Sequence, residues 1–215
     1  MATPIYERQK FFFRRAYEAG ETPWPRLTPT PAVVRLAKRL RRERGRARVL
    51  DVGCGEGRHM ICFAKEGHRA IGVDYEPLAL RKACARADTH PVRPRLTFVL
   101  ADAFRLPFRR DSFDALVDSG CFHHVKKADW SRYLRGLTAL LRPGGYFHLT
   151  TFSTRFKHYP GEHRTRNWIV HRNHYDHFFR KADFAAIFGP RFDILTIEEE
   201  RQSLHAFWHV LMRKC

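Results

Sequence analysis

A glycine-rich loop with acidic neighbours is the first feature of the sequence that could bind a ligand. Asp51 lies near the end of a short apolar run, and three glycines follow it at alternate positions: Gly53, Gly55 and Gly57. Glycines at such a place let the backbone turn tightly and approach a ligand without a Cβ in the way. A second acidic residue, Asp74, stands 21 positions after Gly53. A carboxylate there can accept two hydrogen bonds from a ribose diol.

The spacing and charge of this loop select among nucleotide ligands. Nicotinamide and flavin dinucleotides require G-x-G-x-x-G and place a pyrophosphate at a helix N-terminus. This loop instead reads G-x-G-x-G, and Glu56 joins Asp51 beside it. The negative charges of two carboxylates would repel a pyrophosphate. They suit instead a cationic ligand without phosphate, such as S-adenosylmethionine with its ammonium and sulfonium. The phosphate-binding P-loop is excluded, because no G-K-[ST] follows the glycines.

The elements that must position this loop alternate along the chain. Apolar runs predict strands at 47–52, 69–74, 95–102, 112–120 and 144–152, and two closing strands at 191–200 and 205–214. The intervening segments predict helices at 32–43, 58–67, 77–88, 129–141 and 181–189. This alternation indicates an α/β fold with a largely parallel sheet and helices on both faces. We expect an N-terminal arm or lid at 1–30 and one domain at 31–215.

Five stretches, in this order, resemble the motifs of class I S-adenosylmethionine-dependent methyltransferases. They are VLDVGCGEGRH (49–59), GVDYEP (72–77), ADAFRLPF (101–108), FDALVDSGCFHHV (113–125) and LRPGGYFHLTTF (141–152). The resemblance spans about residues 30 to 152. It implies a Rossmann-like seven-stranded methyltransferase sheet of order 3-2-1-4-5-7-6, whose last strand is antiparallel, and S-adenosylmethionine as the cofactor.

The resemblance also assigns residues to the methionine part of the cofactor. The backbone at Gly53 and Gly55 would hold that part, with Asp51 nearby. Asp118 and Ser119, at the end of the fourth strand, would border it. Ser119 is also consistent with a plain residue at a strand end.

The nucleoside part is assigned to the next two strand ends. Asp74 would bind the ribose hydroxyls, and Tyr75 beside it could cover the adenine. Asp102 would accept a hydrogen bond from the adenine amino group, and the Ala103 amide could contact the ring. Tyr75, like Ser119, also fits a structural role without ligand contact.

The acceptor is less closely defined by the sequence. Enzymes of this class that methylate amino groups of nucleic acids typically carry an N/D-P-P-Y/F/W loop after the fourth strand, whereas this chain has DSGCFHH (118–124). GCFHHV and the early segment AYEAGETPW resemble bacterial small-molecule methyltransferases of the thiol, thiopurine and tellurite-resistance group. A thiol needs little help to lose its proton, while an alcohol or phenol needs a base. We therefore expect a small-molecule acceptor, first a thiol, with oxygen or nitrogen acceptors open.

Two histidines after the fourth strand are the candidate catalytic residues. His123 and His124 would leave that strand toward the transferred methyl group, where one could act as a general base or orient the acceptor. The alternative is that the pair packs under the loop and bonds to backbone. Cys121 is interpreted as a small packing residue, because direct methyl transfer needs no covalent step.

The basic and histidine-rich segment 154–180 has no clear period, and we expect it to form a lid over the acceptor. Arg166 and Trp168 are its candidate acceptor-binding residues, suited to an anionic or aromatic molecule, with Tyr17 and Trp24 on the opposite wall. On a helix, the histidines of HRNHYDH (171–177) would share a face and with its aspartate suggest a metal. The segment lacks the i, i+4 pair of metalloprotease helices, so no metal ligands are assigned.

Charge and composition keep a second function open. The chain carries 40 Lys and Arg against 22 Asp and Glu, a net charge of +18. Such a charge attracts anions in general, and scattered arginines with aromatics make an RNA methyltransferase the alternative. A protein that binds the cofactor without turnover is a third reading. The sequence shows no apolar segment long enough for a membrane span or signal peptide. Five cysteines without a CxxC read as reduced thiols, so we expect a cytoplasmic protein; the oligomeric state is not indicated.

Overall fold

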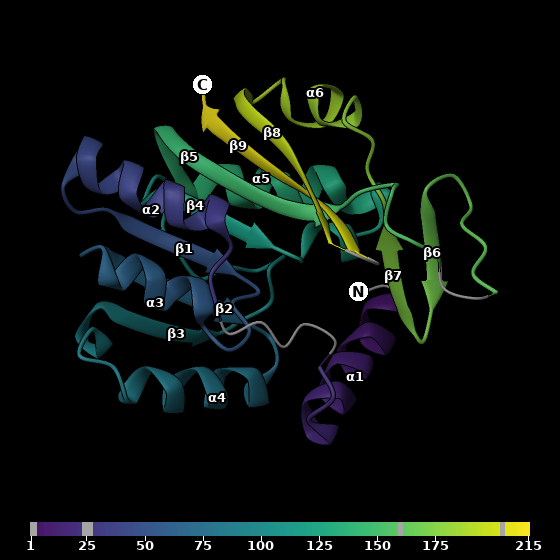
Figure 1. Cartoon of the computed structure of the whole chain (residues 1–215), viewed down its shortest axis with the longest axis horizontal. Helices are drawn as coiled ribbons and strands as arrows, with labels where there is room; N and C mark the ends of the chain where they lie inside the picture. Colours follow the sequence, from purple (N-terminus) through teal and green to yellow (C-terminus); the bar gives the residue numbers. More distant parts are fainter. Residues whose placement is uncertain (1–3, 23–27, 159–160, 203–204) are drawn as a thin grey trace.

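Seven strands form one sheet in the order β3-β2-β1-β4-β5-β9-β8 in the computed structural model (Figure 1). The structure describes residues 4–22, 28–158, 161–202 and 205–215. The strands are β1 (Arg48–Val52), β2 (Arg69–Asp74), β3 (Leu96–Leu100), β4 (Phe113–Ser119), β5 (Leu141–Phe152), β8 (Phe192–Gln202) and β9 (His205–Lys214). Strands β1 to β5 pair in parallel, and β9 pairs antiparallel with β5 and β8. With β8 and β9 as the sixth and seventh strands, the sheet order expected from the resemblance is confirmed.

Helices cover both faces of the sheet, as the alternating pattern predicted. One apolar core joins the sheet to α2 (Pro31–Arg44), α3 (Arg58–Lys65) and α4 (Pro77–Asp88). The other joins the opposite face to α5 (Trp130–Leu140) and α6 (Asp183–Phe188). Neighbouring residues of β1 divide between the cores, since Val49 packs in the first and Leu50 in the second. This alternation along a strand is what a sheet buried on both faces requires.

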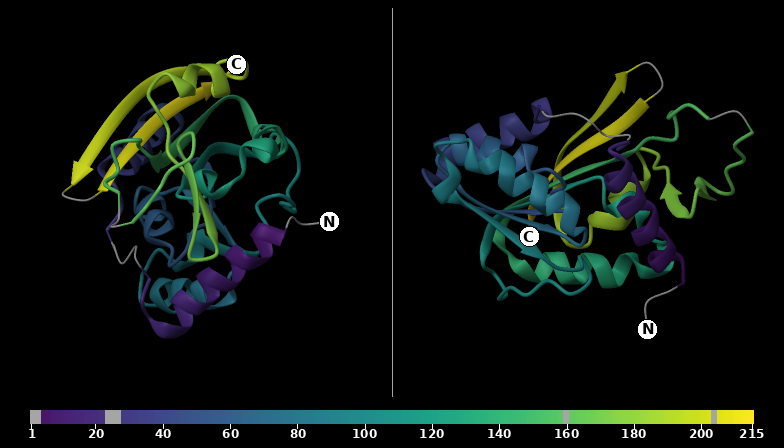
Figure 2. Two further views of the ribbon diagram at one scale, coloured as in Figure 1. Left: turned by 90° about the vertical axis from the view of Figure 1, so that its right-hand side faces the viewer. Right: turned by 90° about the horizontal axis from the view of Figure 1, so that it is seen from below.

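Two elements lie outside this central layer, beyond the carboxyl ends of the parallel strands. Helix α1 (Pro4–Ala19) runs within the predicted N-terminal arm, and strands β6 (Trp168–His171) and β7 (His174–His177) form a separate hairpin. Figures 1 and 2 show α1 beside β7 at this edge. Short turns η1 (Arg93–Arg95), η2 (Phe122–His124) and η3 (Lys127–Asp129) complete the described elements.

The hairpin corrects the helical interpretation of the histidine-rich segment. His171 pairs with His174 across a two-residue loop of Arg172 and Asn173, whose φ angles are 45° and 66°. Positive φ at both loop residues is typical of the type I′ turn, which matches the twist of paired strands. Because side chains alternate along a strand, His174 and Asp176 share a face of β7 while His177 points to the other. His177 accordingly packs on the ring of Trp130, 4.8 Å between centroids.

The helices are short or polar relative to a bilayer. Within the described residues, none combines the length and the apolar character needed to cross a membrane. The described cysteines are free thiols.

Candidate active site

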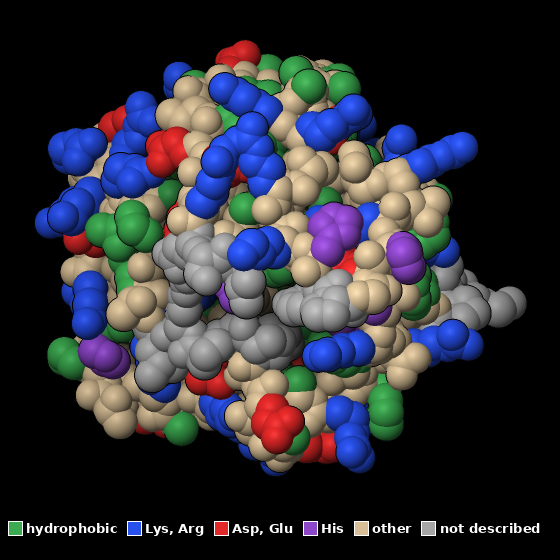
Figure 3. All heavy atoms as spheres, turned by 45° about the vertical axis from the view of Figure 1, so that its right-hand side comes forward, with side chains coloured by type: hydrophobic (Ala, Val, Ile, Leu, Met, Phe, Trp, Pro, Cys, Tyr) green, Lys and Arg blue, Asp and Glu red, His purple; other side chains and the backbone are tan. Residues whose placement is uncertain are grey.

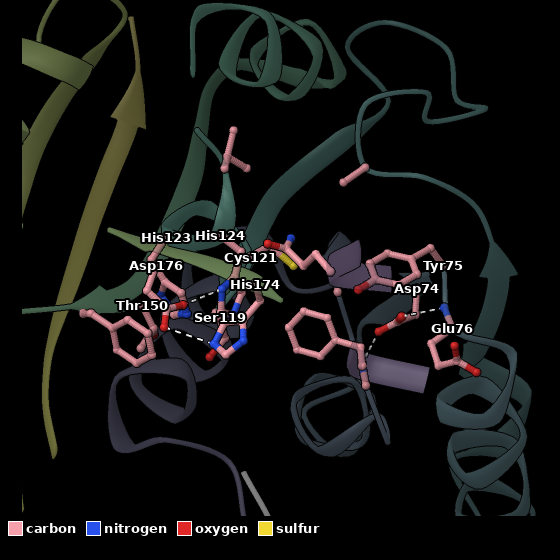
Figure 4. Close-up of a pocket in the computed structure, with 18 of the residues that line it drawn as sticks. Asp74, Tyr75, Glu76, Ser119, Cys121, His123, His124, Thr150, His174 and Asp176 are labelled. Atoms are coloured by element: carbon pink, nitrogen blue, oxygen red, sulfur yellow. Dashed lines mark hydrogen bonds and ion pairs between the residues drawn. The ribbon is translucent and has the colours of Figure 1, made fainter. Parts of the chain in front are cut away.

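A cavity of about 970 Å³ lies at the carboxyl ends of the parallel strands. Its lining falls into two parts (Figure 4). The cofactor half is formed by the loops after β1, β2 and β3, and it includes Asp74 and Tyr75. The acceptor half is formed by η2, the end of β5, helix α1 and the hairpin, and it includes His124 and Asp176. In Figure 4 these two groups of labelled side chains lie on opposite sides of the cavity.

The glycine loop has a backbone that only glycine adopts readily. Gly53, Gly55 and Gly57 have φ angles of 66°, 52° and 76°. A Cβ at Gly53 would lie 2.0 Å from the Sγ atom of Cys121, far inside van der Waals contact. The positive φ values and this close approach explain why glycines stand here. The loop therefore offers bare backbone to the cavity, as the sequence predicted.

Asp74 joins this loop to the end of β2. Its two carboxylate oxygens accept hydrogen bonds from the amides of Gly55 (3.0 Å) and Glu76 (2.9 Å). Burial raises the pKa of Asp74 to about 6, and these backbone donors oppose the rise. Each carboxylate oxygen can accept more than one hydrogen bond, and Asp74 lines the cavity. Its carboxylate can therefore accept further hydrogen bonds from a ligand in the cavity. The position and chemistry fit a ribose diol.

The other predicted nucleoside residues also line the cavity. Tyr75 presents its ring to Phe13 of α1 in an edge contact of 6.2 Å, and burial raises its pKa above the ordinary value. Asp102 accepts from the amide of Phe104 (2.9 Å), and Ala103 lies beside it on the cavity wall. Lys10 of α1 also lies 3.4 Å from the Asp102 carboxylate, and a carboxylate at this strand end suits the amino group of an adenine.

Tyr17 and Ser119 complete the cofactor half. Tyr17 was predicted to face the acceptor, but its hydroxyl lies over the glycine loop, 3.3 Å from where a Cβ of Gly55 would stand. Lys82 approaches the same ring at 5.4 Å. Ser119 lines the cavity at the end of β4. Tyr17 is thus placed near the cofactor loop and not near the hairpin.

Asp118 occupies a different role from the one expected of a cofactor-bordering residue. It is fully buried and is absent from the cavity lining. One oxygen accepts from the amides of Cys121 (2.8 Å) and Phe122 (3.2 Å), and the other accepts from the hydroxyl of Tyr133 (2.8 Å). Burial raises its pKa to about 6, against the pull of these donors. Asp118 therefore fixes the turn from β4 into η2.

Asp51 is also buried beneath the loop and outside the cavity lining, with 2% of its surface exposed. Within the described part of the chain, neither of its carboxylate oxygens has a hydrogen-bond partner. Burial raises its pKa to about 8, while the positive charge of Arg58 opposes this. A cation bound in the neighbouring cavity would favour the ionised form of this carboxyl. This property and the glycine cradle fit a cationic nucleoside such as S-adenosylmethionine.

The two candidate catalytic histidines have different surroundings. His123 is 3% exposed, its ring stacks on Phe152 at 3.7 Å, and Nδ1 lies 3.4 Å from the Thr151 hydroxyl. Burial holds its pKa well below the ordinary value. His124 faces the hairpin, where Nδ1 lies 2.8 Å from a carboxylate oxygen of Asp176 and 3.0 Å from the carbonyl oxygen of Tyr175. His124 is the better placed of the two to be held in orientation by a carboxylate.

Asp176 is the centre of a group that we call the hairpin cluster: His124, His171, His174 and Asp176. The Nε2 atoms of His171 and His174 lie 2.6 and 3.1 Å from the same Asp176 oxygen. Burial alone would raise the pKa of Asp176, but hydrogen bonds from the three histidines outweigh it and hold the pKa well below the ordinary value. Sequence spacing indicated the hairpin members but not His124, which stands about 50 positions earlier.

Aromatic side chains form most of the remaining wall of the acceptor half. Phe12 stacks on His174 at 4.1 Å and 27°, and Phe13 meets His124 edge-on at 5.2 Å. Further aromatic residues that line the cavity are Phe152, Phe156, Phe178 and Phe207. Neither Phe12 nor Phe13 was identified from the sequence, although the FFF run contains both. The walls of the acceptor half are therefore mostly flat and apolar, with one polar region at the hairpin cluster.

The other predicted acceptor residues do not reach this wall. Arg166 is exposed in the turn before β6, and Trp168 is 36% exposed and stacks on Tyr175. Neither lines the cavity, because Arg166 lies in a turn and Trp168 lies on the hairpin face opposite to His171 and Asp176. Trp24 lies outside the described residues. The segment 154–180 does border the acceptor half, but through other residues than those expected.

Cys121 is packed against the glycine loop, with its Sγ atom 3.4 Å from the carbonyl oxygen of Val52. Burial raises the pKa of this thiol well above its ordinary value. The thiol therefore stays protonated, in keeping with a packing role and not with a nucleophile.

Comparisons with known proteins agree with this arrangement. A family model described as a methyltransferase domain matches residues 49–145. An uncharacterized methyltransferase of Synechocystis sp. is 30% identical over 122 residues, which are 57% of this chain and 50% of that protein. A probable thiol methyltransferase 2 of Arabidopsis thaliana is 27% identical over 133 residues, 62% of this chain and 58% of that one. The chain thus spans about half the length of these relatives.

Among solved structures, the fold resembles the 1,6-didemethyltoxoflavin-N1-methyltransferase of Burkholderia thailandensis, which was crystallised with 1,6-didemethyltoxoflavin and S-adenosylhomocysteine bound. The TM-score is 0.77 at 24% identity, covering 100% of this chain and 91% of that chain. The strand order, the glycine loop with Asp74 and the match to the family model agree with one another. Residues 49–145 match a methyltransferase domain, and the chain has the sheet order of the S-adenosylmethionine-dependent methyltransferase fold.

Proposed function

We propose that the protein methylates a small, flat aromatic or heteroaromatic molecule at an atom that carries a proton, first a thiol, with hydroxyl and ring nitrogen as further classes. The observation that carries this proposal is the acceptor half of the cavity. It has aromatic walls from α1 and β5 and a polar corner at His124. Flat apolar walls favour flat apolar ligands, and one polar corner favours a single oriented reactive atom.

The names of similar proteins support the class of acceptor. The Arabidopsis relative is named as a probable thiol methyltransferase, and the Burkholderia enzyme was crystallised with a nitrogen heterocycle. A relative from Mycobacteroides abscessus, 28% identical over 136 residues, is named as a methyltransferase of 2-heptyl-1-hydroxyquinolin-4(1H)-one. A thiol, a hydroxyquinolinone and a nitrogen heterocycle occur among these names, and two of these three are flat ring compounds.

S-adenosylmethionine supplies a methyl group on a positively charged sulfur. In the proposed reaction Asp74 and the glycine loop orient the nucleoside end, and the aromatic walls align the acceptor with the methyl carbon. A lone pair of the acceptor forms the new bond to carbon, and the electron pair of the broken carbon–sulfur bond returns to sulfur. The proton of the acceptor passes to His124, which Asp176 holds in orientation. Helix α1 and the hairpin keep water from the reacting atoms.

RNA methylation is the second candidate, and the net charge of +18 motivates it. Lys and Arg side chains are spread across the face shown in Figure 3 and do not form one continuous band. Spread charge attracts anions of many kinds, including small anionic acceptors. The apolar acceptor half favours the small molecule.

The test is transfer of a labelled methyl group to matched acceptors. Purified protein is incubated with S-adenosylmethionine and aromatic thiols, phenols and nitrogen heterocycles, beside aliphatic thiols and total RNA. The proposal expects methylated aromatic product, with the aromatic thiol turned over faster than an aliphatic thiol of similar pKa. Asp74→Ala serves as the control that removes the ribose partner. Methylation of RNA alone, or of aliphatic thiols in preference to aromatic ones, would overturn the proposal.

A further inference from the structure

The turn of the hairpin holds three potential metal ligands in a fixed arrangement. His171 and His174 face each other across the strand pair, and Asp176 follows two positions later on the same face of β7. The type I′ loop sets the register of the two strands and so sets the spacing of these side chains. Two residues are buried, and His171 retains 26% of its side-chain surface.

The donor atoms of these residues converge on one point. One ring nitrogen of His171, one of His174 and a carboxylate oxygen of Asp176 all lie within 4.8 Å of one another. Ligand atoms that share one ion at metal–ligand distances of about 2.0–2.2 Å stand roughly 3 to 3.5 Å apart. The two nitrogen–oxygen distances, 2.6 and 3.1 Å, are close to that range.

We propose that His171, His174 and Asp176 bind a divalent transition-metal ion of the zinc type at the wall of the acceptor half. Two imidazoles and one carboxylate suit Zn²⁺, Fe²⁺, Co²⁺ or Ni²⁺, whereas Mg²⁺ and Ca²⁺ prefer oxygen ligands. All three residues line the cavity, so coordination positions not filled by protein face the acceptor. An open position is the mark of a site that binds an exogenous ligand.

His124 supports this site from outside the ligand set. Its Nδ1 atom lies 2.8 Å from the Asp176 oxygen that is not shared by the two hairpin histidines. This close contact with the second oxygen of the carboxylate restrains the Asp176 side chain, as groups around a metal ligand commonly do. Phe12 stacks on the His174 ring and restrains it in the same way. The support comes from η2 and α1, so the site is held by three elements.

The ion would bias the choice of acceptor, and this point rests on the proposed function. Asp176 is the one anionic ligand of the set, so a bound divalent ion keeps a positive charge. The remaining charge faces the cavity and favours an acceptor that coordinates as an anion, such as a thiolate or phenolate. The binding of the ion itself is independent of methyl transfer and can be measured without any acceptor.

The test measures metal binding by the full chain after removal of any affinity tag, since a histidine tag would bind the same ions. Protein dialysed against chelator is titrated with Zn²⁺ by competition with a chromophoric chelator, and with Co²⁺ by visible absorption. The proposal expects one ion per chain, with Co²⁺ bands that report nitrogen and oxygen ligands. His171→Ala, which changes the most exposed ligand, is expected to weaken Zn²⁺ binding more than tenfold, and His174→Ala likewise.

The matched control is His163→Ala, which removes an exposed histidine of the same segment outside the cluster. It is expected to leave Zn²⁺ affinity unchanged. Circular dichroism of each variant confirms that it is folded before its affinity is compared. Absence of stoichiometric Zn²⁺ and Co²⁺ binding by the wild-type chain, or equal affinity in His171→Ala and His163→Ala, would overturn the metal site. Neither result depends on whether any acceptor is methylated.

Discussion

His123 and His124 are neighbours in the chain, yet their rings can do different things. The His123 ring stacks on Phe152, and its Nδ1 atom is 3.4 Å from the Thr151 hydroxyl, so packing holds it. His124 is bound at Nδ1 by the hairpin, which leaves Nε2 as its second polar atom. A base held by a carboxylate on one ring nitrogen acts with the other. The sequence alone could not separate the two residues, because the separation depends on Asp176.

We expect His124→Ala to lower kcat by roughly 10²- to 10⁴-fold, the range for loss of a general base. Affinity for S-adenosylhomocysteine should stay within about twofold, because His124 belongs to the acceptor half. His123→Phe keeps an aromatic ring against Phe152 and should lose far less activity. Steady-state kinetics and calorimetry on both variants check this. A large loss in His123→Phe with full activity in His124→Ala would reverse the assignment.

Asp51 should make the free energy of unfolding decrease as pH rises. Its pKa is raised by burial from 3.8 to about 8. A carboxyl whose pKa is higher in the folded state adds stability below the unfolded pKa and loses that contribution as pH rises through the folded pKa. The contribution of Asp51 to the free energy of unfolding should therefore fall between about pH 4 and pH 8.

Asp51→Asn removes this titration and should flatten the decline of stability over that window. The wild-type chain should lose on the order of 3–5 kcal/mol more than the variant between pH 4 and pH 8. Denaturant unfolding without cofactor, followed at several pH values, measures the difference. Asp193→Asn changes an exposed carboxylate and serves as the control. Parallel stability curves for the wild type and Asp51→Asn would show that Asp51 is not held in the way described.

Helix α1 connects the two halves of the cavity at the scale of elements. Phe13 contacts Tyr75 on the cofactor side and His124 on the acceptor side. Tyr6 donates a hydrogen bond to a carboxylate oxygen of Asp129 (2.7 Å), which anchors the start of the helix to η3. The helix thus acts as a wall shared by both ligands and not only as an arm.

Phe13→Ala should weaken binding of both the cofactor and the acceptor, since it removes edge contacts to each half. Aromatic contacts of this kind contribute about 0.5–1.5 kcal/mol, which corresponds to roughly 2- to 12-fold in affinity. Phe11→Ala removes a phenylalanine of the same helix that is 58% exposed, and it should change neither affinity. Calorimetry with S-adenosylhomocysteine and KM for the acceptor give the two readings. Equal effects of the two substitutions would contradict the shared wall.

The central sheet could be predicted from the sequence, whereas α1 and the hairpin could not, for a physical reason. The strands of the sheet are continuous apolar runs buried on both faces, and that pattern is local. In α1 the run Phe11–Phe13 extends around the helix, and Phe11 points to solvent, so no single apolar stripe marks the helix. The hairpin has strands of only four residues, and the partners of β7, whose sequence is HYDH, lie in α1 and η2.

The same limit applied to individual site residues. Gly53, Gly55 and Asp74 line the cavity, and this location could be predicted because it depends on the loop after β1 and the end of β2 alone. Asp118 has the right position at a strand end, but the amides of η2 use its carboxylate. Trp168 has suitable chemistry, but the strand alternation of the hairpin turns it outward. Contacts between segments far apart in the chain determine where these side chains point, and residue spacing in the sequence does not show such contacts.

The whole molecule carries a net charge of +18, and Lys and Arg side chains are scattered across the face shown in Figure 3. Such a field raises the local concentration of anionic acceptors and is screened by salt. The Debye length shortens from about 30 Å at 0.01 M to about 8 Å at 0.15 M ionic strength. We therefore expect kcat/KM for an anionic aromatic acceptor to fall severalfold over this range, and that of a neutral analogue of the same shape to change much less. Initial rates for the pair at several salt concentrations test this, and equal salt dependence would remove the steering role.

The adenosyl group of S-adenosylmethionine is expected to bind between the glycine loop and Asp74. Calorimetric titration with S-adenosylhomocysteine measures this directly, and the wild-type chain should bind one molecule. Asp74→Ala loses the charged acceptor of the ribose hydroxyls, a contact worth about 1.5–3 kcal/mol, so its affinity should fall more than tenfold. Absence of binding heat in the wild type, or unchanged affinity in Asp74→Ala, would contradict the central claim.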